Sequence, residues 1–137
     1  MDKLIVKLEI VKAITKEIHY DSFGLSFYGV HLLMDKIGED IDTFIDDINE
    51  ICFLGSNMKP PCKKRIYQEV SEELPHEVDL RNLKVALIGV LDQIDNIGKG
   101  HSEVMFVNDA GVDDLLGRIS SNIKKSLGLV NRTLATD

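Results

Sequence analysis

The segment from residue 27 to residue 54, FYGVHLLMDKIGEDIDTFIDDINEICFL, decides the fold of this chain. It contains no proline, and its apolar residues recur every three or four positions: Val30, Leu33, Met34, Ile37, Ile41, Phe44, Ile45, Ile48 and Ile51. That spacing places them on one face of an α-helix. We therefore predict one helix of about 28 residues, or roughly 42 Å. Gly55, Ser56 and Asn57 are expected to end it, with Gly55 in the left-handed conformation that closes many helices.

The same helical period runs through most of the remaining chain. It predicts long helices over residues 3–21, 78–97 and 112–134, and a short helix over 61–73 inside the proline-containing connection 58–76. Ser26 is expected to cap the second helix, and an extension of the third long helix past Gly98 to Val107 is left open. Four long helices with one long crossover are the ferritin-like variant of the four-helix bundle. The predicted fold class is all-α, a ferritin-like four-helix bundle with a short helix between helices two and three.

Length and composition narrow the class of protein. A chain of 137 residues suits one domain, here residues 1–137. Its 44% hydrophobic and 28% charged residues are ordinary for a soluble globular protein and exclude disorder and collagen-like repeats. No apolar run reaches the roughly 18 residues of a membrane helix, and the N-terminus lacks the apolar core of a signal peptide. We therefore expect a cytoplasmic protein without a membrane segment.

The two cysteines and the overall charge exclude further classes of protein. Cys52 and Cys62 cannot build a disulfide framework, their separation fits no zinc pattern, and we expect both to be buried or half-exposed thiols. The formal net charge of -7 argues against general nucleic-acid binding. It leaves open a cationic partner such as a metal ion.

Acidic residues are concentrated in the segment 27–54. Seven acids against one base, Lys36, leave it a net charge of -6: Asp35, Glu39, Asp40, Asp42, Asp46, Asp47 and Glu50. A solvated face is the ordinary interpretation of such a run. The helix also carries a dense apolar set that must be buried, however, and like charges four residues apart destabilise a helix unless a cation lies between them.

Two pairs on this helix have the spacing that aligns side chains on one face: His31 with Asp35, and Asp46 with Glu50. Within one chain the pairs lie about 22 Å apart. If two copies of the helix cross antiparallel, the numbers of facing residues add to a constant, and both 31 with 50 and 35 with 46 add to 81. A two-fold axis near residues 40 and 41 would then create two equivalent sites.

His19 adds a further possible ligand to each site. It precedes His31 by twelve residues, and a short helical hairpin can bring the two to the same level. The resulting set has two imidazoles and three carboxylates. Mixed nitrogen and oxygen ligands suit iron, zinc or manganese better than calcium.

At these residues the sequence resembles the Dps family, the DNA-protecting mini-ferritins of starved cells. The matching positions are His19-Tyr20, Gly24, Phe27, His31, Asp35, Asp46, Glu50, Leu54 and Gly55. Asp113-Asp114-Leu115-Leu116 and Lys124-Lys125-Ser126-Leu127 are similar to the last helix of the family. The resemblance implies a catalytic metal site with five ligands: His19, His31 and Asp35 from one subunit, and Asp46 and Glu50 from its dimer mate.

The function of the resembled family is the function that we expect of this chain. The resemblance implies a homo-oligomeric shell of twelve subunits that protects against oxidative stress. Its ferroxidase sites oxidise iron(II) with hydrogen peroxide or oxygen, and the shell stores the ferric mineral. Zinc or manganese could occupy the sites in place of iron. Asp109, Asp113 and Asp114 lie in the region that corresponds to the acidic pores through which iron passes.

The chain also departs from the family. Trp is usual at the positions of Tyr20 and Gly128, and a lysine-rich N-terminal arm is common. Lys3, Lys7, Lys12 and Lys16 are expected on a solvent-facing helix instead, so DNA binding should be weak or absent at physiological salt. Two alternatives stay open: a helical assembly protein with a structural or vestigial metal site, and a nucleoid-associated protein. Glu73 and His76 have a ligand-like spacing, but Pro75 between them favours a surface loop.

Overall fold

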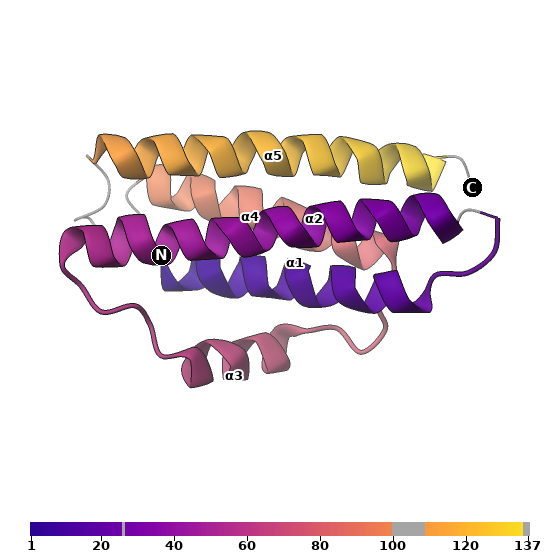
Figure 1. Ribbon diagram of the computed structural model, residues 1–137, viewed down its shortest axis with the longest axis horizontal. Coiled ribbons are helices and arrows are strands. Elements are labelled where there is room, and N and C mark those ends of the chain that lie inside the picture. The colour runs from indigo at the N-terminus through magenta and orange to yellow at the C-terminus, as the bar shows by residue number, and fades with distance from the viewer. Residues whose placement is uncertain (26, 100–108, 136–137) are drawn as a thin grey trace.

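The computed structural model describes residues 1–25, 27–99 and 109–135, which form four long helices, several short helical segments and no strand (Figure 1). The helices are α1 (Asp2–Asp21), α2 (Phe27–Asp47), α3 (Lys63–Glu73), α4 (Leu80–Gly98) and α5 (Ala110–Ala135). The predicted all-α class, with four long helices and a short one in the long connection, is confirmed.

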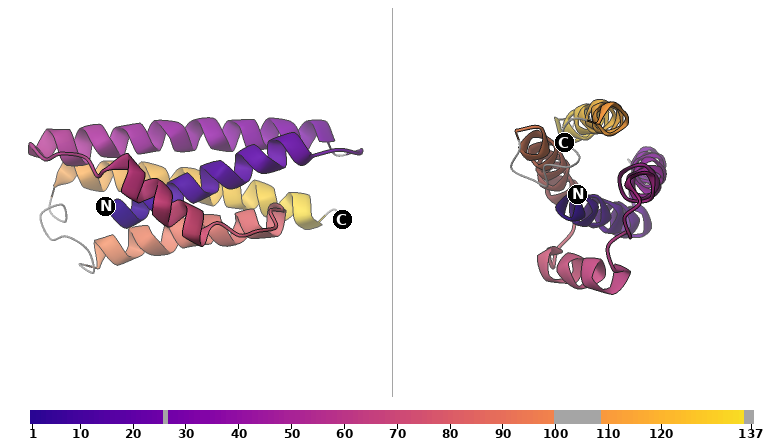
Figure 2. Two further views of the ribbon diagram at one scale, coloured as in Figure 1. Left: turned by 90° about the horizontal axis from the view of Figure 1, so that it is seen from below. Right: turned by 90° about the vertical axis from the view of Figure 1, so that its left-hand side faces the viewer.

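The long helices form a bundle in which the second and third run the same way. α1 and α2 make an antiparallel hairpin, α4 runs in the direction of α2, and α5 returns beside α4 (Figure 1). Seen end-on, the four long helices surround a common core and α3 lies outside them, next to α1 (Figure 2). Ile66 and Val70 are the buried residues of α3, and their spacing of four gives this short helix one apolar face. The long crossover on which the ferritin-like prediction rested is therefore present.

The start of α4 is fixed by a capping box rather than by the apolar period. Asp79 Oδ1 accepts the backbone N–H of Asn82 at 2.9 Å, and Asn82 Oδ1 accepts that of Asp79 at 3.1 Å. The helix therefore begins at Leu80, two residues after the predicted start. The predicted cap at Ser26 and the extension to Val107 lie outside the described residues.

The prediction of an unbroken α-helix to residue 54 is wrong. After Asp47 the chain continues as a π-helix, η1 (Ile48–Phe53), and then as a 3₁₀ turn, η2 (Leu54–Ser56). In an α-helix the consecutive residues Cys52 and Phe53 would point about 100° apart. The wider π turn reduces that angle, and both side chains reach the core, at 0% and 3% exposure.

The left-handed residue at the end of this helix is Asn57, with φ 57°, and not Gly55 as predicted. The N–H of Met58 donates to the carbonyl of Phe53 at 2.7 Å, and that of Asn57 to the carbonyl of Leu54 at 3.0 Å. These two bonds are the Schellman pattern, in which asparagine is tolerated as the left-handed residue. The helical turns simply end two residues later than the glycine suggested.

The core lies between the four long helices and consists mainly of branched aliphatic side chains. Its largest fully buried members are Leu4, Leu8, Ile14, Met34, Ile37, Ile41, Ile48, Leu83, Leu87, Ile97 and Leu115. Every long helix contributes to it, so the bundle is held together mainly by apolar burial. Within the described ranges no helix combines the length and the apolar character needed to cross a membrane.

Two predictions about exposure are partly wrong. Cys52 is buried as expected, whereas Cys62 is exposed at the start of α3. Lys3 and Lys16 are exposed, but Lys7 and Lys12 are half-buried. Each of these two lysines lies within ion-pair distance of an acidic residue on another helix, which the α1 sequence alone could not reveal.

Candidate metal centre

The turn between α1 and α2 brings the two predicted histidine ligands together. Ser22 ends α1, where its backbone N–H donates to the carbonyl of Ile18 at 3.0 Å. Gly24 then adopts φ 93°, a left-handed conformation that glycine reaches without a steric penalty. The N–H of Phe27 donates to the carbonyl of Gly24 at 3.2 Å, and α2 begins. The last turn of α1 therefore lies beside the first turns of α2.

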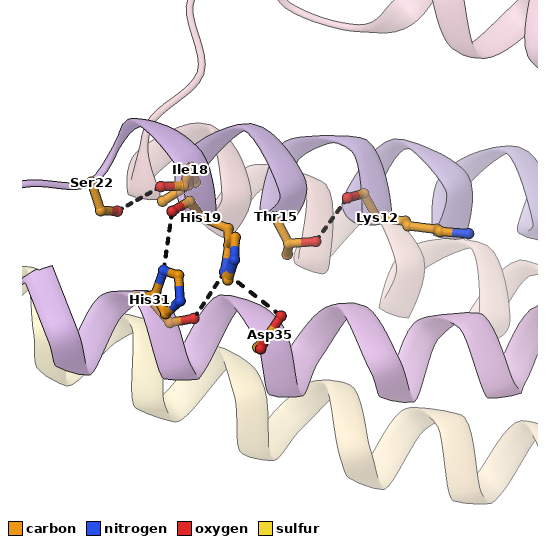
Figure 3. Close-up of polar contacts among 7 residues, drawn as sticks. All are labelled: Lys12, Thr15, Ile18, His19, Ser22, His31 and Asp35. Atoms are coloured by element: carbon orange, nitrogen blue, oxygen red, sulfur yellow. Dashed lines mark hydrogen bonds and ion pairs between the residues drawn. The ribbon is translucent and has the colours of Figure 1, made fainter.

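His19 and His31 lie face to face between the two helices (Figure 3). Their ring centroids are 3.7 Å apart and the ring planes differ by 25°. The ring of Phe27, one turn before His31, packs at 5.2 Å on that imidazole, and the ring of Tyr20 meets His19 edge-on at 5.1 Å. Aromatic contacts thus hold both imidazoles in place.

Main-chain carbonyls fix the orientation of both rings. His19 Nδ1 lies 3.2 Å from the carbonyl oxygen of His31, and His31 Nδ1 lies 3.3 Å from that of His19 (Figure 3). A carbonyl oxygen can only accept a hydrogen bond, so each Nδ1 must carry the proton. A neutral imidazole that is protonated at Nδ1 has its lone pair on Nε2. That lone pair can bind a metal ion.

Asp35 joins the two imidazoles one turn after His31. Its Oδ1 lies 3.6 Å from His19 Nδ1, and its side chain is 50% exposed (Figure 3). The carboxylate borders a cavity of about 170 Å³ between α1 and α2, which Thr15 and Gly38 also line. The structure therefore brings together His19, His31 and Asp35, the three residues predicted to come from one subunit.

Asp46 and Glu50 lie elsewhere on the same chain. Asp46 is exposed in the last turn of α2, about 22 Å along the helix from His31, and Glu50 is exposed four residues further on, in η1. In the part of the chain that the structure describes, no three His, Cys, Asp or Glu side chains converge closely enough to hold a metal ion, the neighbouring His19, His31 and Asp35 included. One chain therefore presents the predicted ligands as two separate groups, which the dimer prediction treats as partial sites.

The sequence did not predict an ion pair that joins α1 and α2. Lys12 Nζ donates to Asp42 Oδ1 at 2.7 Å, and this hydrogen bond raises the pKa of Lys12. Burial raises the pKa of the neighbouring Glu9. The two paired residues are 30 positions apart, so no local pattern marks them. The one indication of this ion pair in the sequence is the predicted antiparallel hairpin, because the hairpin that pairs His19 with His31 also brings residue 12 near residue 42.

The other candidate residues have structural surroundings. Asp109 Oδ1 accepts the N–H groups of Gly111 and Val112 at the start of α5, and Asp114 pairs with Arg118 at 3.1 Å. His76 is exposed in the loop after α3, in agreement with the surface-loop prediction. His101 lies outside the described residues.

Comparisons with known proteins bear on the fold. The chain matches no protein-family model and no curated protein sequence. Among solved structures it is similar to Dps from Microbacterium arborescens in the high iron form, with a TM-score of 0.76 and 16% sequence identity. The match covers 98% of this chain and 89% of that chain. The described part of the chain therefore has a Dps-like, ferritin-like fold.

Proposed function

We propose that the protein is a Dps-like ferroxidase that stores and detoxifies iron, with active sites that form between two copies of the chain. Each site takes His19, His31 and Asp35 from one copy and Asp46 and Glu50 from the other. The observation that carries this proposal is the histidine pair, in which each Nδ1 faces a main-chain carbonyl and leaves the lone pair to Nε2, with Asp35 one turn after His31. The structurally similar Dps, solved in a high iron form, makes iron the first metal to consider.

Symmetry supports the shared site. Both partial sites contain a pair spaced by four on the exposed side of α2 and η1, and the two pairs are too far apart to act on one ion within a chain. An antiparallel crossing about residues 40 and 41 brings each pair opposite the complementary pair of the partner. A two-fold dimer then contains two identical sites.

The site chemistry suits oxidation of iron(II), which is the substrate. Two iron(II) ions each give one electron to hydrogen peroxide, which takes up two protons and leaves as two water molecules. Because both electrons pass to one peroxide, no hydroxyl radical is released. The carboxylates of Asp35, Asp46 and Glu50 are hard oxygen ligands that favour the iron(III) product over iron(II).

Storage requires an assembly larger than the dimer. Dimers built in this way would form a closed shell, twelve subunits in the resembled family, with the oxidised iron inside and Asp109, Asp113 and Asp114 at the pores. Such a protein would act in the cytoplasm with little or no affinity for DNA. Zinc and manganese are the alternative metals that the same ligands would bind.

Oxidation of iron(II) by limiting hydrogen peroxide, followed by absorbance, tests the proposed activity. The wild type should react much faster than buffer, and His31→Ala and Asp46→Ala should each lose the fast phase. Asp92→Ala, on the exposed surface of α4, is the control and should retain wild-type kinetics. A wild type no faster than buffer would contradict the ferroxidase proposal and favour a structural or vestigial site.

A further inference from the structure

An acidic stripe runs along the exposed side of α2. It consists of Asp35, Glu39, Asp42 and Asp46, which are spaced by four, three and four residues and are all exposed. This spacing keeps the four carboxylates on one helix face. If two copies cross there antiparallel, eight carboxylates face one another, and like charges at such a contact oppose association unless cations neutralise them.

The ends and the centre of the stripe differ in their possible counter-ions. Asp35 and Asp46 belong to the proposed metal sites, where a divalent ion would neutralise them. At the centre, such a crossing would place Glu39 opposite Asp42 of the partner subunit, since 39 and 42 also add to 81. The central carboxylates therefore need a cation from the protein.

Lys12 is placed to supply that cation. Its ammonium lies 2.7 Å from Asp42 Oδ1, and its side chain is only 38% exposed. It lines both the cavity of about 170 Å³ beside His19 and a second cavity of about 220 Å³ beside Asp46. The lysine thus reaches the stripe at its midpoint, between the two partial sites.

We propose that Lys12 is the fixed counter-ion at the centre of the dimer contact, neutralising Asp42 of its own chain and Glu39 of the partner subunit. Lys12 is a positioning residue, since it allows two partial sites to meet without contacting the iron itself. The inference rests on the shared site proposed above. It adds the residue that makes the two acidic helices compatible.

Sedimentation velocity over a dilution series, with Co²⁺ present, measures the dimer dissociation constant. Lys12→Met should raise that constant roughly tenfold or more, because it leaves carboxylates unpaired in a desolvated contact. Lys12→Arg should stay near the wild type. Lys12→Met combined with Asp42→Asn should recover part of the loss, because one of the two uncompensated carboxylates is gone.

Lys36→Met is the matched control. Lys36 Nζ lies 2.9 Å from Asp40 Oδ1. The other carboxylate oxygen of Asp40 accepts a hydrogen bond from the side-chain amide of Asn122 on α5. That pair lies on the flank of α2 that faces α5, so its loss should leave the dissociation constant unchanged. Helical circular dichroism checks that every variant is folded, and the double variant repeats the test in a chain with one uncompensated carboxylate fewer.

The outcomes separate this inference from the proposed function. If the wild type is dimeric and Lys12→Met has the same dimer dissociation constant, the role of Lys12 is overturned and the shared site is left intact. The same holds if Lys36→Met raises the dissociation constant as much as Lys12→Met does. Failure of Asp42→Asn to recover any of the loss would also overturn that role. A wild type that remains monomeric at every concentration would contradict the shared site itself.

Discussion

The imidazoles of His19 and His31 stack at 3.7 Å, and the Nδ1 of each faces the main-chain carbonyl of the other residue. This reciprocal arrangement couples the last turn of α1 to the second turn of α2. It fixes the tautomer and the ring position within one chain. Two of the five proposed ligands are therefore in place before a second copy arrives, which lowers the entropic cost of binding.

Substitution of either histidine should weaken divalent-metal binding in the assembled protein. We expect His19→Ala to lower the affinity for Co²⁺ by at least about tenfold, since loss of an outer-shell partner alone costs that much. The visible absorbance of bound Co²⁺ measures the affinity. His76→Ala, which alters an exposed loop histidine, is the control. Equal affinity in His19→Ala and wild type would remove this residue from the site.

Removal of divalent metal should loosen the dimer. A ligand shared by two chains stabilises their association, by about 2.7 kcal/mol per site at a hundred times its dissociation constant. Addition of a chelator is therefore expected to raise the dimer dissociation constant measured by sedimentation. Glu50→Ala, with an incomplete site, should respond less. A dimer equally stable with and without metal would show that the ions do not bridge the chains.

The two thiols should differ in reactivity. Backbone N–H groups of Arg65 and Lys64 lower the pKa of Cys62, whereas burial raises the pKa of Cys52 to about 11. Because the thiolate is the reactive form, one thiol per chain should react quickly with an aromatic disulfide reagent. Its rate should reach half of its plateau below pH 9.0, the ordinary value.

Cys62→Ser is expected to abolish the fast phase of this reaction, and the remaining thiol should react only when the chain unfolds. A fast phase that survives in Cys62→Ser would contradict the burial of Cys52.

The close approach of α1 and α2 should be sensitive to side-chain size at Gly38. A Cβ atom at this position would lie 3.3 Å from the hydroxyl oxygen of the buried Thr15. Gly38→Leu should therefore lower the free energy of unfolding by about 1–3 kcal/mol, measured in urea. Gly117→Leu is the control, because nothing lies within 4 Å of that Cβ position; it should be neutral or stabilising, since leucine favours helix.

The sequence was sufficient to predict the bundle and the histidine pair for physical reasons. The period of apolar residues marks each long helix, and a short turn forces neighbouring helices to be antiparallel, so His19 and His31 meet. The η1 segment was not predictable in this way, because the burial of both Cys52 and Phe53 is settled by the rest of the core. Since η1 begins two residues after Asp46 and contains Glu50, it also sets the orientation of Glu50, a predicted ligand.

The ion pair of Lys12 and Asp42 shows the other limit of the sequence. Lysines spaced along an amphipathic helix predict a solvent-facing side, and this holds for Lys3 and Lys16. Which lysine pairs with another helix depends on the register between α1 and α2 and on how closely they pack. Those quantities follow from the folded core and are not visible in the period of a single helix.

The central claim, one active site built from two chains, is tested most directly by mixing two inactive variants. His31→Ala and Asp46→Ala are dissociated, combined in equal amounts and reassembled, and the oxidation of iron(II) by peroxide is measured. Each mixed dimer should contain one intact site, so random pairing should restore about one quarter of wild-type activity. A mixture of His31→Ala with Asp35→Ala, whose lesions fall in the same half of the site, should restore none. Equal inactivity of both mixtures would contradict the shared site.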